Sequence, residues 1–387
     1  MIRILTIIGA RPQIIKAAAI SRAIRNHFSD RISEIIVHTG QHYDENMSGV
    51  FMGELNVPAA NYNLGVGSAS HGKQTAAMLQ GIEDILLKEK PDALIIYGDT
   101  NSTIAGGIAA SKIHIPVIHI EAGLRSFNKL MPEEINRICC DHISTLLFSP
   151  TKTAVNNLQK EGFNIFSKSP YSIDNPGVFH CGDIMYDNSL HFAGIAKKQS
   201  NILKELELKE GSFILATVHR DLNTDDSANL NNLFSSFNTI AAENKITIVL
   251  PLHPRTRKMM DQLLNEQLQN NLQNNLYIKI IPPASFLDVT LLESTCSMIM
   301  TDSGGVQKEA YFFNKPCLIL REETEWVELV ENGCARLTGT DPSRIFAAFN
   351  FFSNNKTMKF PPVFGDGKAA EFICEKIVEV FEMKKSY

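Results

Sequence analysis

Short, continuously apolar runs alternate with longer helical stretches along this chain, and this alternation restricts the possible folds more than any other feature. Helical patterns such as Ile14–Arg25, Gly72–Lys88 and Ser102–Lys112 separate the apolar runs of the first half. Strands that are apolar throughout and are joined by helices are typical of parallel sheets with helices on both faces. The sequence therefore predicts an α/β fold. The strands expected in the first half are Ile2–Ile8, Glu34–Thr39, Ala93–Tyr97, Val117–Ile120 and Thr145–Ser149.

The second half of the chain repeats the same style without repeating the sequence. A set of apolar runs again alternates with helical patterns, and 387 residues are enough for two domains with full cores. We therefore expect two doubly wound, Rossmann-like domains. The strands expected in the second half are Phe213–Thr217, Ile246–Leu250, Tyr277–Ile281, Met298–Met300 and Pro316–Leu320.

A segment without periodicity separates the two sets. The stretch SKSPYSIDNPGVFHCGD is rich in Ser, Pro, Asn and Gly, which favours a linker between domains. The expected divisions are an N-terminal domain at 1–175, a second domain at 176–365 and a final segment at 366–387. Within that last segment, Gly367–Lys385 has the pattern of an amphipathic helix.

Composition excludes several classes of function. The formal net charge is -5, whereas a nucleic-acid-binding face needs an excess of basic residues. No run approaches the roughly 20 apolar residues of a membrane span, and the N-terminal run is too short for a signal peptide. The seven cysteines lack CxxC spacing, which indicates reduced thiols in a cytoplasmic protein. The histidines and cysteines also lack metal-ligand spacing, so we expect no metal site.

Charged residues follow several strands of the first half. Arg11 and Lys16 come after the first strand, near the start of a helix, where cations suit a phosphate. Asp99 follows the strand Ala93–Tyr97, and Glu121 follows Val117–Ile120. Each residue alone has a plainer interpretation, such as a surface cation or an N-cap aspartate. Two carboxylates delivered to one sheet edge, however, suit the removal and return of a proton.

The segment RSFNKLMPEEINR adds Glu133, Glu134 and Arg137. Proline followed by two acidic residues is typical of an ordinary helix start, because acidic side chains favour the positive end of the helix dipole. On spacing alone, this segment is structural.

The second half places residues suited to anions after its strands. His219 follows the strand Phe213–Thr217 closely and is an acid/base candidate, and His253 follows the next strand. The turn Ser303-Gly304-Gly305 opens a helix, where backbone N–H groups favour an anion, and Arg321 follows the last expected strand. One half thus supplies carboxylates and the other an anion site, an inventory that suits a nucleotide-sugar ligand.

Seven motifs, taken together and in order, resemble the non-hydrolysing UDP-N-acetylglucosamine 2-epimerase family. They are GARPQIIKAA, TGQHYD, YGDTNST, HIEAGLRS, MPEEINR, HPRT and TDSGGVQKEA. The resemblance implies the GT-B fold, in which two Rossmann-like domains face a cleft and the C-terminal helix crosses back to the first domain. It also implies a UDP-sugar substrate, no added cofactor and a homodimer.

The resemblance further implies a mechanism. A base removes the C2 proton of the sugar while UDP leaves C1, and UDP adds back to the glycal intermediate after a proton returns on the opposite face. The family motifs then place catalytic roles on Asp99, Glu121, Glu133 and His219, which replaces the structural interpretation of Glu133. The implied substrate-binding residues are Arg11, Lys16, Arg137, His253, Ser303, Gly304, Gly305, Glu309 and Arg321.

Two departures from the family pattern concern the sugar and its regulation. Leu222 stands where many members have an acid, and TEWVE replaces the TERPE that is typical of the UDP-GlcNAc enzymes. The TEWVE segment resembles that of a branch of the family that acts on UDP-2,3-diacetamido-glucuronate. Gln41 and His42 of the family's allosteric site are present, but LGVGSASHGKQTA departs from its pattern.

Three other functions remain open on the sequence. A GT-B glycosyltransferase would use a similar cleft but would need an acceptor. A hydrolysing epimerase would release free ManNAc and UDP. A sensor of sugar nucleotides would bind its ligand without turnover, although the complete set of acid/base candidates argues against it.

Overall fold

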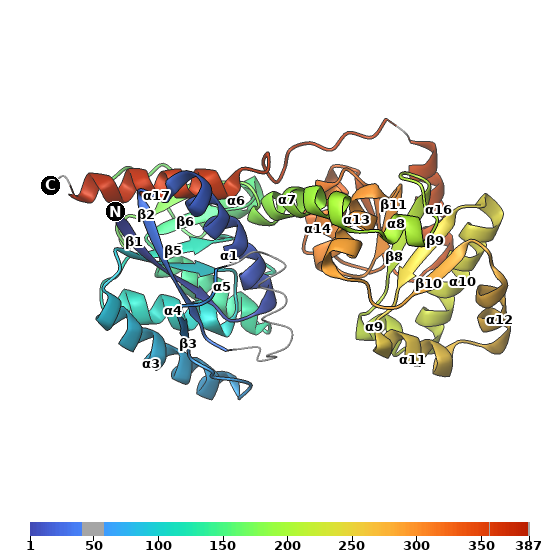
Figure 1. Ribbon diagram of the computed structural model, residues 1–387, viewed down its shortest axis with the longest axis horizontal. Coiled ribbons are helices and arrows are strands. Elements are labelled where there is room, and N and C mark those ends of the chain that lie inside the picture. Colours follow the sequence, from blue (N-terminus) through green and yellow to red (C-terminus); the bar gives the residue numbers. More distant parts are fainter. Residues whose placement is uncertain (41–57, 356, 386–387) are drawn as a thin grey trace. The chain divides into compact units, whose positions relative to one another are not determined.

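The computed structural model describes residues 1–40, 58–355 and 357–385, and it contains two parallel β-sheets (Figure 1). The strand order is β3-β2-β1-β4-β5-β6-β7 in the first sheet and β10-β9-β8-β11-β12-β13 in the second. The first sheet comprises β1 Ile2–Ile8, β2 Ile32–His38, β3 Tyr62–Asn63, β4 Ala93–Tyr97, β5 Val117–Ile120, β6 Leu146–Ser149 and β7 Gly177–His180. The second comprises β8 Phe213–Thr217, β9 Thr247–Pro251, β10 Ile278–Ile281, β11 Met298–Thr301, β12 Cys317–Ile319 and β13 Ala335–Leu337.

The apolar runs form the central strands, as the sequence predicts. Every residue of β4, β5 and β11 is buried, because helices cover both faces of the sheet. Three strands were not predicted, namely β3, β7 and β13, and each lies at the edge of its sheet. They have two to four residues, so they are too short to give a clear apolar run.

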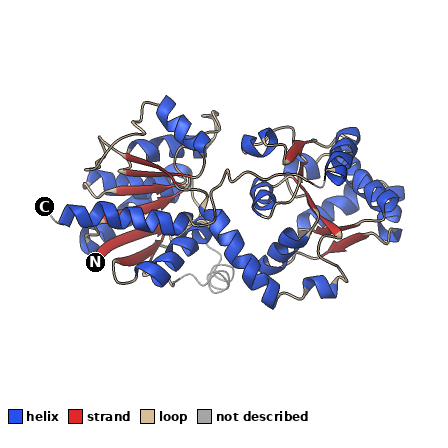
Figure 2. Cartoon of the chain, turned by 90° about the horizontal axis from the view of Figure 1, so that it is seen from above, coloured by secondary structure: helices blue, strands red, loops and turns tan. Residues whose placement is uncertain are grey.

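Helices pack on both faces of each sheet (Figure 2). In the first sheet's layers lie α1 Arg11–Ala23, the π-helix η1 Ile24–Phe28, α3 His71–Glu89, α4 Asn101–Lys112, α5 Pro132–His142, α6 Lys152–Lys160 and α17 Ala369–Lys385. The remaining helices are α7 Ile184–Gln199, α8 Ile202–Glu205, α9 Asp221–Thr224, α10 Ser227–Asn244, α11 Pro254–Leu263, α12 Glu266–Asn274, α13 Phe286–Thr295, α14 Gly304–Phe312, α15 Val327–Glu331 and α16 Pro342–Asn354. None of the described helices has the length and apolar character needed to cross a membrane.

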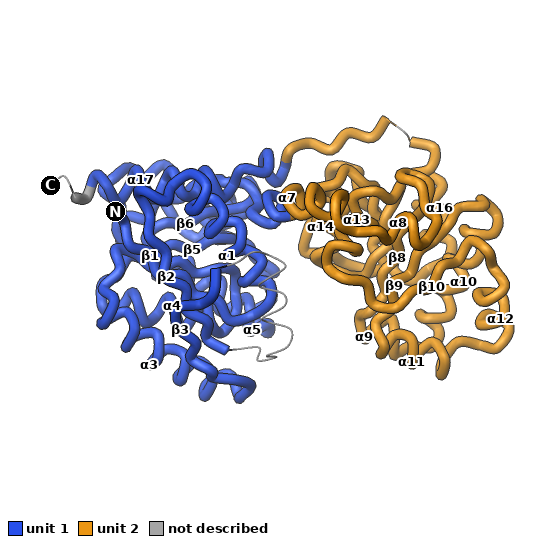
Figure 3. The backbone as a smooth tube through the Cα atoms, in the orientation of Figure 1, with its two compact units in different colours: residues 1–188, 363–387 blue, residues 189–362 orange. Residues whose placement is uncertain are grey.

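The chain divides into two compact units (Figure 3). Unit 1 contains Met1–Asn188 and Val363–Tyr387, and unit 2 contains Ser189–Pro362. Both units are doubly wound and parallel, so the predicted fold class of two Rossmann-like domains is confirmed. The C-terminal helix α17 packs against α1 in unit 1, as expected for a helix that returns to the first domain.

Each sheet has one point where the strand order reverses. In unit 1 the chain passes from β1 outward to β2 and β3, and then continues on the other side of β1 with β4. Unit 2 has the same reversal between β8 and β11. Ligands of doubly wound sheets bind beyond the carboxyl ends of the strands at such a point. The turns after β1, β4, β8 and β11 are therefore where a site is expected.

The buried carboxylate of Asp187, in α7, fixes the start of α17. Its two oxygens accept hydrogen bonds from the backbone N–H groups of Ala369, at 3.1 Å, and Ala370, at 2.7 Å. Burial raises the pKa of Asp187 to about 6, although these two hydrogen bonds and the charge of Arg22 act in the opposite direction. The attachment of the last helix to unit 1 therefore includes a group that titrates in mildly acidic solution.

The raised pKa of Asp187 predicts a pH-dependent stability. Between about pH 4 and pH 6 the folded chain holds a proton that the unfolded chain has released, so this residue's contribution to the free energy of unfolding falls as pH rises. Asp187→Asn cannot titrate. We expect wild type to lose roughly 1–3 kcal/mol relative to the variant across this window, as measured by urea unfolding at several pH values. A constant difference between the two proteins would contradict this assignment.

Candidate functional site

The turn after β4 presents Asp99 as a pairing group and not as a helix cap. Helix α4 is capped by Thr100, whose hydroxyl accepts a hydrogen bond from the backbone N–H of Thr103. The capping explanation for Asp99 is therefore wrong. Its carboxylate lies 2.5 Å from the guanidinium of Arg137, in α5, and its side chain remains 28% exposed. Asp99 is thus held by a cation and is still accessible from outside.

The turn after β5 brings a second carboxylate to the same edge. Glu121 pairs with Lys16 of α1, and both side chains are almost buried. Glu121 has a backbone φ of 78°, a left-handed conformation that is uncommon for a non-glycine residue. A Cβ atom on Gly98 would lie 3.1 Å from Oε2 of Glu121 and 3.2 Å from Nζ of Lys16. The Lys16–Glu121 pair therefore lies directly against the residue that precedes Asp99.

Helix α5 separates the two adjacent glutamates of the MPEEINR motif. Glu134 is buried, lies 2.9 Å from Arg137 and accepts hydrogen bonds from the backbone N–H groups of Ser126 and Phe127. Burial raises the pKa of Glu134, but these three donors outweigh that effect and leave its pKa below the ordinary value. Glu133 is exposed in the first turn of the same helix. The structure therefore places Glu134 beside the Arg137–Asp99 pair, and it leaves Glu133 at the surface.

In unit 2, the candidate His219 is oriented by Asp302, which sequence reasoning missed. Asp302 is fully buried after β11 and lies 3.1 Å from Nδ1 of His219. It also accepts hydrogen bonds from the backbone N–H groups of His219 and Arg220 and from the amide of Asn223. Burial raises the pKa of Asp302, yet the contacts with His219 and the other donors leave it lowered. The pairing uses Nδ1, so Nε2 is the nitrogen available for proton transfer.

Helix α14 begins at the predicted anion site. Ser303 is its N-cap, and its hydroxyl accepts a hydrogen bond from the backbone N–H of Val306 at 3.5 Å. A Cβ atom on Gly304 would lie 2.2 Å from Oε1 of Glu325, whereas one on Gly305 would have only Ser303 Oγ nearby, at 3.9 Å. A side chain at 304 would therefore have to displace the Glu325 carboxylate. At 305 the chain itself gives no steric reason for glycine, and the space beside it is open.

The Glu325 carboxylate joins Arg321 to the start of α14. Arg321 Nη1 lies 2.9 Å from Glu325 Oε2, and the Arg321 side chain is only 15% exposed. In the described structure, a protein carboxylate thus lies at a helix N-terminus that favours negative charge. An anionic ligand at this position must share Arg321 with Glu325 or displace it.

The other candidates have varied surroundings. His253 caps α11, and its Nδ1 accepts a hydrogen bond from the backbone N–H of Arg255. Glu309, in α14, lies near the buried Glu293, and burial followed by the charge of Glu309 raises the pKa of Glu293 well above its ordinary value. Arg11 is exposed at the first position of α1. Gln41 and His42 lie outside the described residues.

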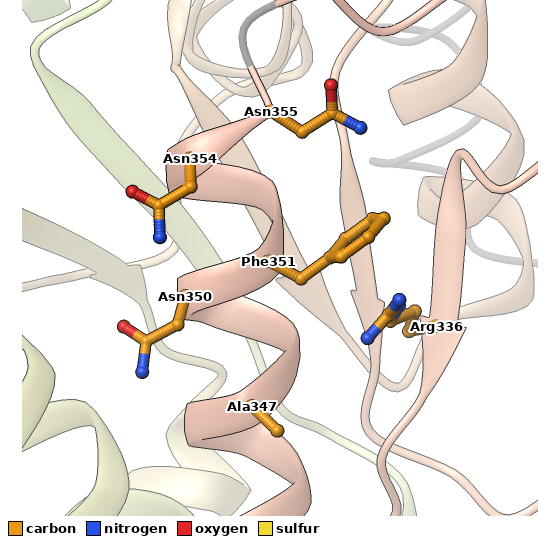
Figure 4. Close-up of a pocket in the computed structure, with 6 residues that line it drawn as sticks. All are labelled: Arg336, Ala347, Asn350, Phe351, Asn354 and Asn355. Carbon is orange, nitrogen blue, oxygen red and sulfur yellow. The ribbon is translucent and has the colours of Figure 1, made fainter.

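A surface pocket on α16 does not involve any of these residues. It is lined by Arg336, whose guanidinium lies 3.5 Å from the ring centre of Phe351, and by small and polar side chains of the same helix (Figure 4). Across the described chain, no group of three or more His, Cys, Asp or Glu side chains has an arrangement suited to a metal ion.

The model of the UDP-N-acetylglucosamine 2-epimerase family matches residues 24–378. The chain belongs to this family. It is 48% identical over 380 residues to a UDP-N-acetylglucosamine 2-epimerase homolog of Methanococcus maripaludis, an alignment that covers 98% of this chain and 99% of the relative. The family resemblance seen in the seven motifs is thereby confirmed.

Two further relatives of this family member have more specific names. The chain is 43% identical over 378 residues to the UDP-2,3-diacetamido-2,3-dideoxy-D-glucuronate 2-epimerase of Pseudomonas aeruginosa, which covers 98% of this chain and 100% of the relative. A solved structure of the UDP-GlcNAc 2-epimerase of Methanocaldococcus jannaschii, in complex with UDP-GlcNAc and UDP, is 40% identical with a TM-score of 0.77. It covers 98% of this chain and 100% of that chain.

Proposed function

We propose that this chain is an isomerase that interconverts UDP-GlcNAc and UDP-ManNAc by inverting C2, and that it supplies precursors of surface polysaccharides. Membership of the family supports this reaction class. The observation that carries the proposal is the meeting of Asp99 and Glu121 at one sheet edge, each paired with its own cation. Inversion by elimination and re-addition needs one group to remove the C2 proton and another to return a proton on the opposite face.

Unit 1 would carry the proton chemistry. Asp99 and Glu121 act at C2, and the Arg137 and Lys16 side chains hold these carboxylates and contact the substrate. Fixed orientation of acid and base groups is what makes such a step fast. Glu133 stays in the proposed acid/base set on the family resemblance, from a position at the helix start where a bound ligand could meet it.

Unit 2 would hold UDP while its bond to the sugar is broken and remade. Gly305 is open to a ligand, and N–H groups at the start of α14 favour a diphosphate. The residues proposed to bind the UDP-sugar come from both units. They are Arg11, Lys16, Arg137, His253, Ser303, Gly304, Gly305, Glu309 and Arg321, with Glu309 at the ribose hydroxyls. His219, oriented by Asp302, is placed near the diphosphate, where its Nε2 can exchange a proton as UDP leaves. No added cofactor is needed for this sequence of steps.

The same chemistry on UDP-2,3-diacetamido-2,3-dideoxy-glucuronate is the second candidate. It is favoured by the 43% identity to the Pseudomonas aeruginosa enzyme and by the TEWVE segment, which contains the single tryptophan of the chain. Trp326 lies beside the proposed UDP site, and Nζ of Lys308 lies over its ring, 4.2 Å from the ring centre. We also propose that the chain acts as a homodimer in the cytoplasm, which light scattering and cell fractionation would check.

A substrate panel tests the proposed function. UDP-GlcNAc and UDP-2,3-diacetamido-glucuronate are incubated separately with the enzyme in deuterated water, without any acceptor, and C2 is followed by NMR. We expect deuterium at C2 and the second epimer with one of the two substrates. Free ManNAc would identify a hydrolysing enzyme instead. Turnover only after addition of an acceptor would identify a glycosyltransferase, and binding without turnover would identify a sensor.

Replacement of Asp99 by asparagine should separate chemistry from binding. Asp99→Asn keeps the shape of the side chain but cannot take a proton, so C2 exchange should slow by roughly 100-fold or more. Affinity for UDP, measured by calorimetry, should change less than threefold because the start of α14, where the diphosphate is proposed to bind, lies in the other unit. Near-normal exchange in this variant would remove Asp99 from the mechanism.

Removal of the Glu325 charge should strengthen UDP binding. Glu325→Gln eliminates a carboxylate at the proposed diphosphate position, and a charge at a helix end contributes on the order of 1 kcal/mol, so UDP affinity should rise several-fold.

Arg321→Ala should weaken UDP binding about tenfold or more, because it removes a charge-assisted hydrogen bond.

Glu322→Gln is the matched control for the Glu325 prediction. Glu322 lies three residues earlier and pairs with Arg344, so the control makes the same change of charge away from Gly304. Its UDP affinity should equal that of wild type in calorimetric titrations. Equal UDP affinities for wild type, Glu325→Gln and Glu322→Gln would show that Glu325 does not compete with the ligand.

A further inference from the structure

His119 is a fully buried histidine in the middle of the first sheet, and both of its ring nitrogens have partners. Nδ1 lies 2.7 Å from Oδ1 of Asp141, in α5, and Nε2 lies 2.8 Å from the carbonyl oxygen of Gly98. Its neighbours in β5, Ile118 and Ile120, belong to the apolar core. A polar side chain at such a position is costly unless its hydrogen bonds are complete, so these two contacts require an explanation.

The geometry fixes where the protons are. A carbonyl oxygen can only accept, so Nε2 of His119 carries a hydrogen. The second oxygen of Asp141 lies 2.7 Å from Arg125 and accepts a hydrogen bond from the backbone N–H of Gly123 at 3.1 Å, which favours the carboxylate form. The first oxygen of Asp141 therefore accepts as well, and Nδ1 of His119 also carries a hydrogen. These contacts are the ones that an imidazolium ring would make.

The His119 ring is one end of a row of alternating charges. In space, His119 contacts Asp141, and Asp141 contacts Arg125. Glu161 accepts two hydrogen bonds from Arg125, at 2.7 and 2.6 Å. Burial lowers the pKa of Arg125, but Glu161 and Asp141 outweigh that effect and raise it. Each charge in the row lies beside a charge of the opposite sign, which is the condition for keeping such groups inside a protein. The row can therefore persist in the folded enzyme.

Both turns that carry candidate acid/base residues are attached to this row. The Gly98 carbonyl directly precedes Asp99, and Gly98 has a φ of 61°. The Gly123 N–H is two residues after Glu121, which has a φ of 78°. Helix α5 also supplies Asn136, whose amide donates to the carbonyl oxygen of Asp99 at 2.8 Å. Hydrogen bonds in which the donor or the acceptor is charged are stronger than neutral ones, and Gly123 donates to the Asp141 carboxylate, so these turns are held tightly.

We propose that the His119–Asp141 pair, supported by Arg125 and Glu161, is a positioning element that holds the Gly98 and Gly123 turns so that Asp99 and Glu121 meet C2 correctly. This inference rests on the proposed function. None of the four residues needs to touch the substrate. They act through the backbone on the two residues that do, and the charge on the ring is what makes the hold strong.

The first test is made on the wild-type protein. The folded wild-type enzyme is labelled with ¹⁵N at histidine, and the His119 signals are assigned with His119→Gln. At neutral pH, both ring nitrogens of His119 should show the shifts of protonated nitrogens. The shifts of a neutral ring would overturn the proposal. This readout does not depend on activity, so it remains decisive even if the substrate panel finds no turnover.

The second test separates positioning from binding. Asp141→Asn should reduce kcat for C2 exchange by about 10- to 100-fold, the range found when a hydrogen-bonding partner of a metal ligand is removed, while KM and UDP affinity stay within about threefold. The His119 ring should become neutral in the same variant. Unchanged kcat in a folded variant would overturn the positioning role, and so would a loss that appears only in KM.

Asp187→Asn is the matched control for Asp141→Asn. Asp187 is also a buried carboxylate of unit 1 that accepts backbone hydrogen bonds, but it holds the start of α17 and not the strand ends. Its kcat should remain within about twofold of wild type. Equal losses in both variants would show a general loss of stability. If Asp141→Asn does not fold, Glu161→Gln at the exposed end of the row should give a smaller loss of kcat, and an unchanged kcat there would count against the proposal.

Discussion

Everything proposed for this protein depends on the reversal of strand order in each sheet. Parallel strands deliver the residues that follow them to one edge, and the reversal opens a space there that no crossover helix fills. Unit 1 uses the turns after β4 and β5 for carboxylates, and unit 2 uses the turns after β8 and β11 for His219 and the start of α14. One architectural rule thus produces two edges, and the side chains alone make them different.

The two edges differ in how their charges are balanced. In unit 1, Asp99 and Glu121 each face a cation from a helix, so the pairs can be exchanged for contacts with a substrate. In unit 2, the buried Asp302 is satisfied mainly by backbone N–H groups and by His219. Partners of the first kind are side chains, whereas most partners of the second kind are backbone groups. The arrangement suits chemistry at the first edge and firm binding at the second.

The sequence predicts the centre of the fold better than its edges, and it indicates the candidate acid/base residues but not the residues that support them. Central strands are buried on both faces and therefore appear as apolar runs, while β3, β7 and β13 are too short to do so. Asp99 and Glu121 could be found because a charged residue directly after an apolar run is conspicuous. His119 and Asp141 could not, since they are 22 residues apart and acquire their meaning only when a strand packs against a helix. Asp302 was visible in TDSGG, but its partners come from a turn some 80 residues earlier.

The return of the C-terminal segment to unit 1 has a consequence for the order of synthesis and folding. Unit 2 is one continuous stretch of chain, so all its residues have left the ribosome before those of α17. The Asp187 carboxylate, by contrast, must wait for N–H groups 182 and 183 residues later in the chain. Unit 1 is therefore completed after unit 2, and the proposed proton chemistry has no finished scaffold until α17 has been synthesised.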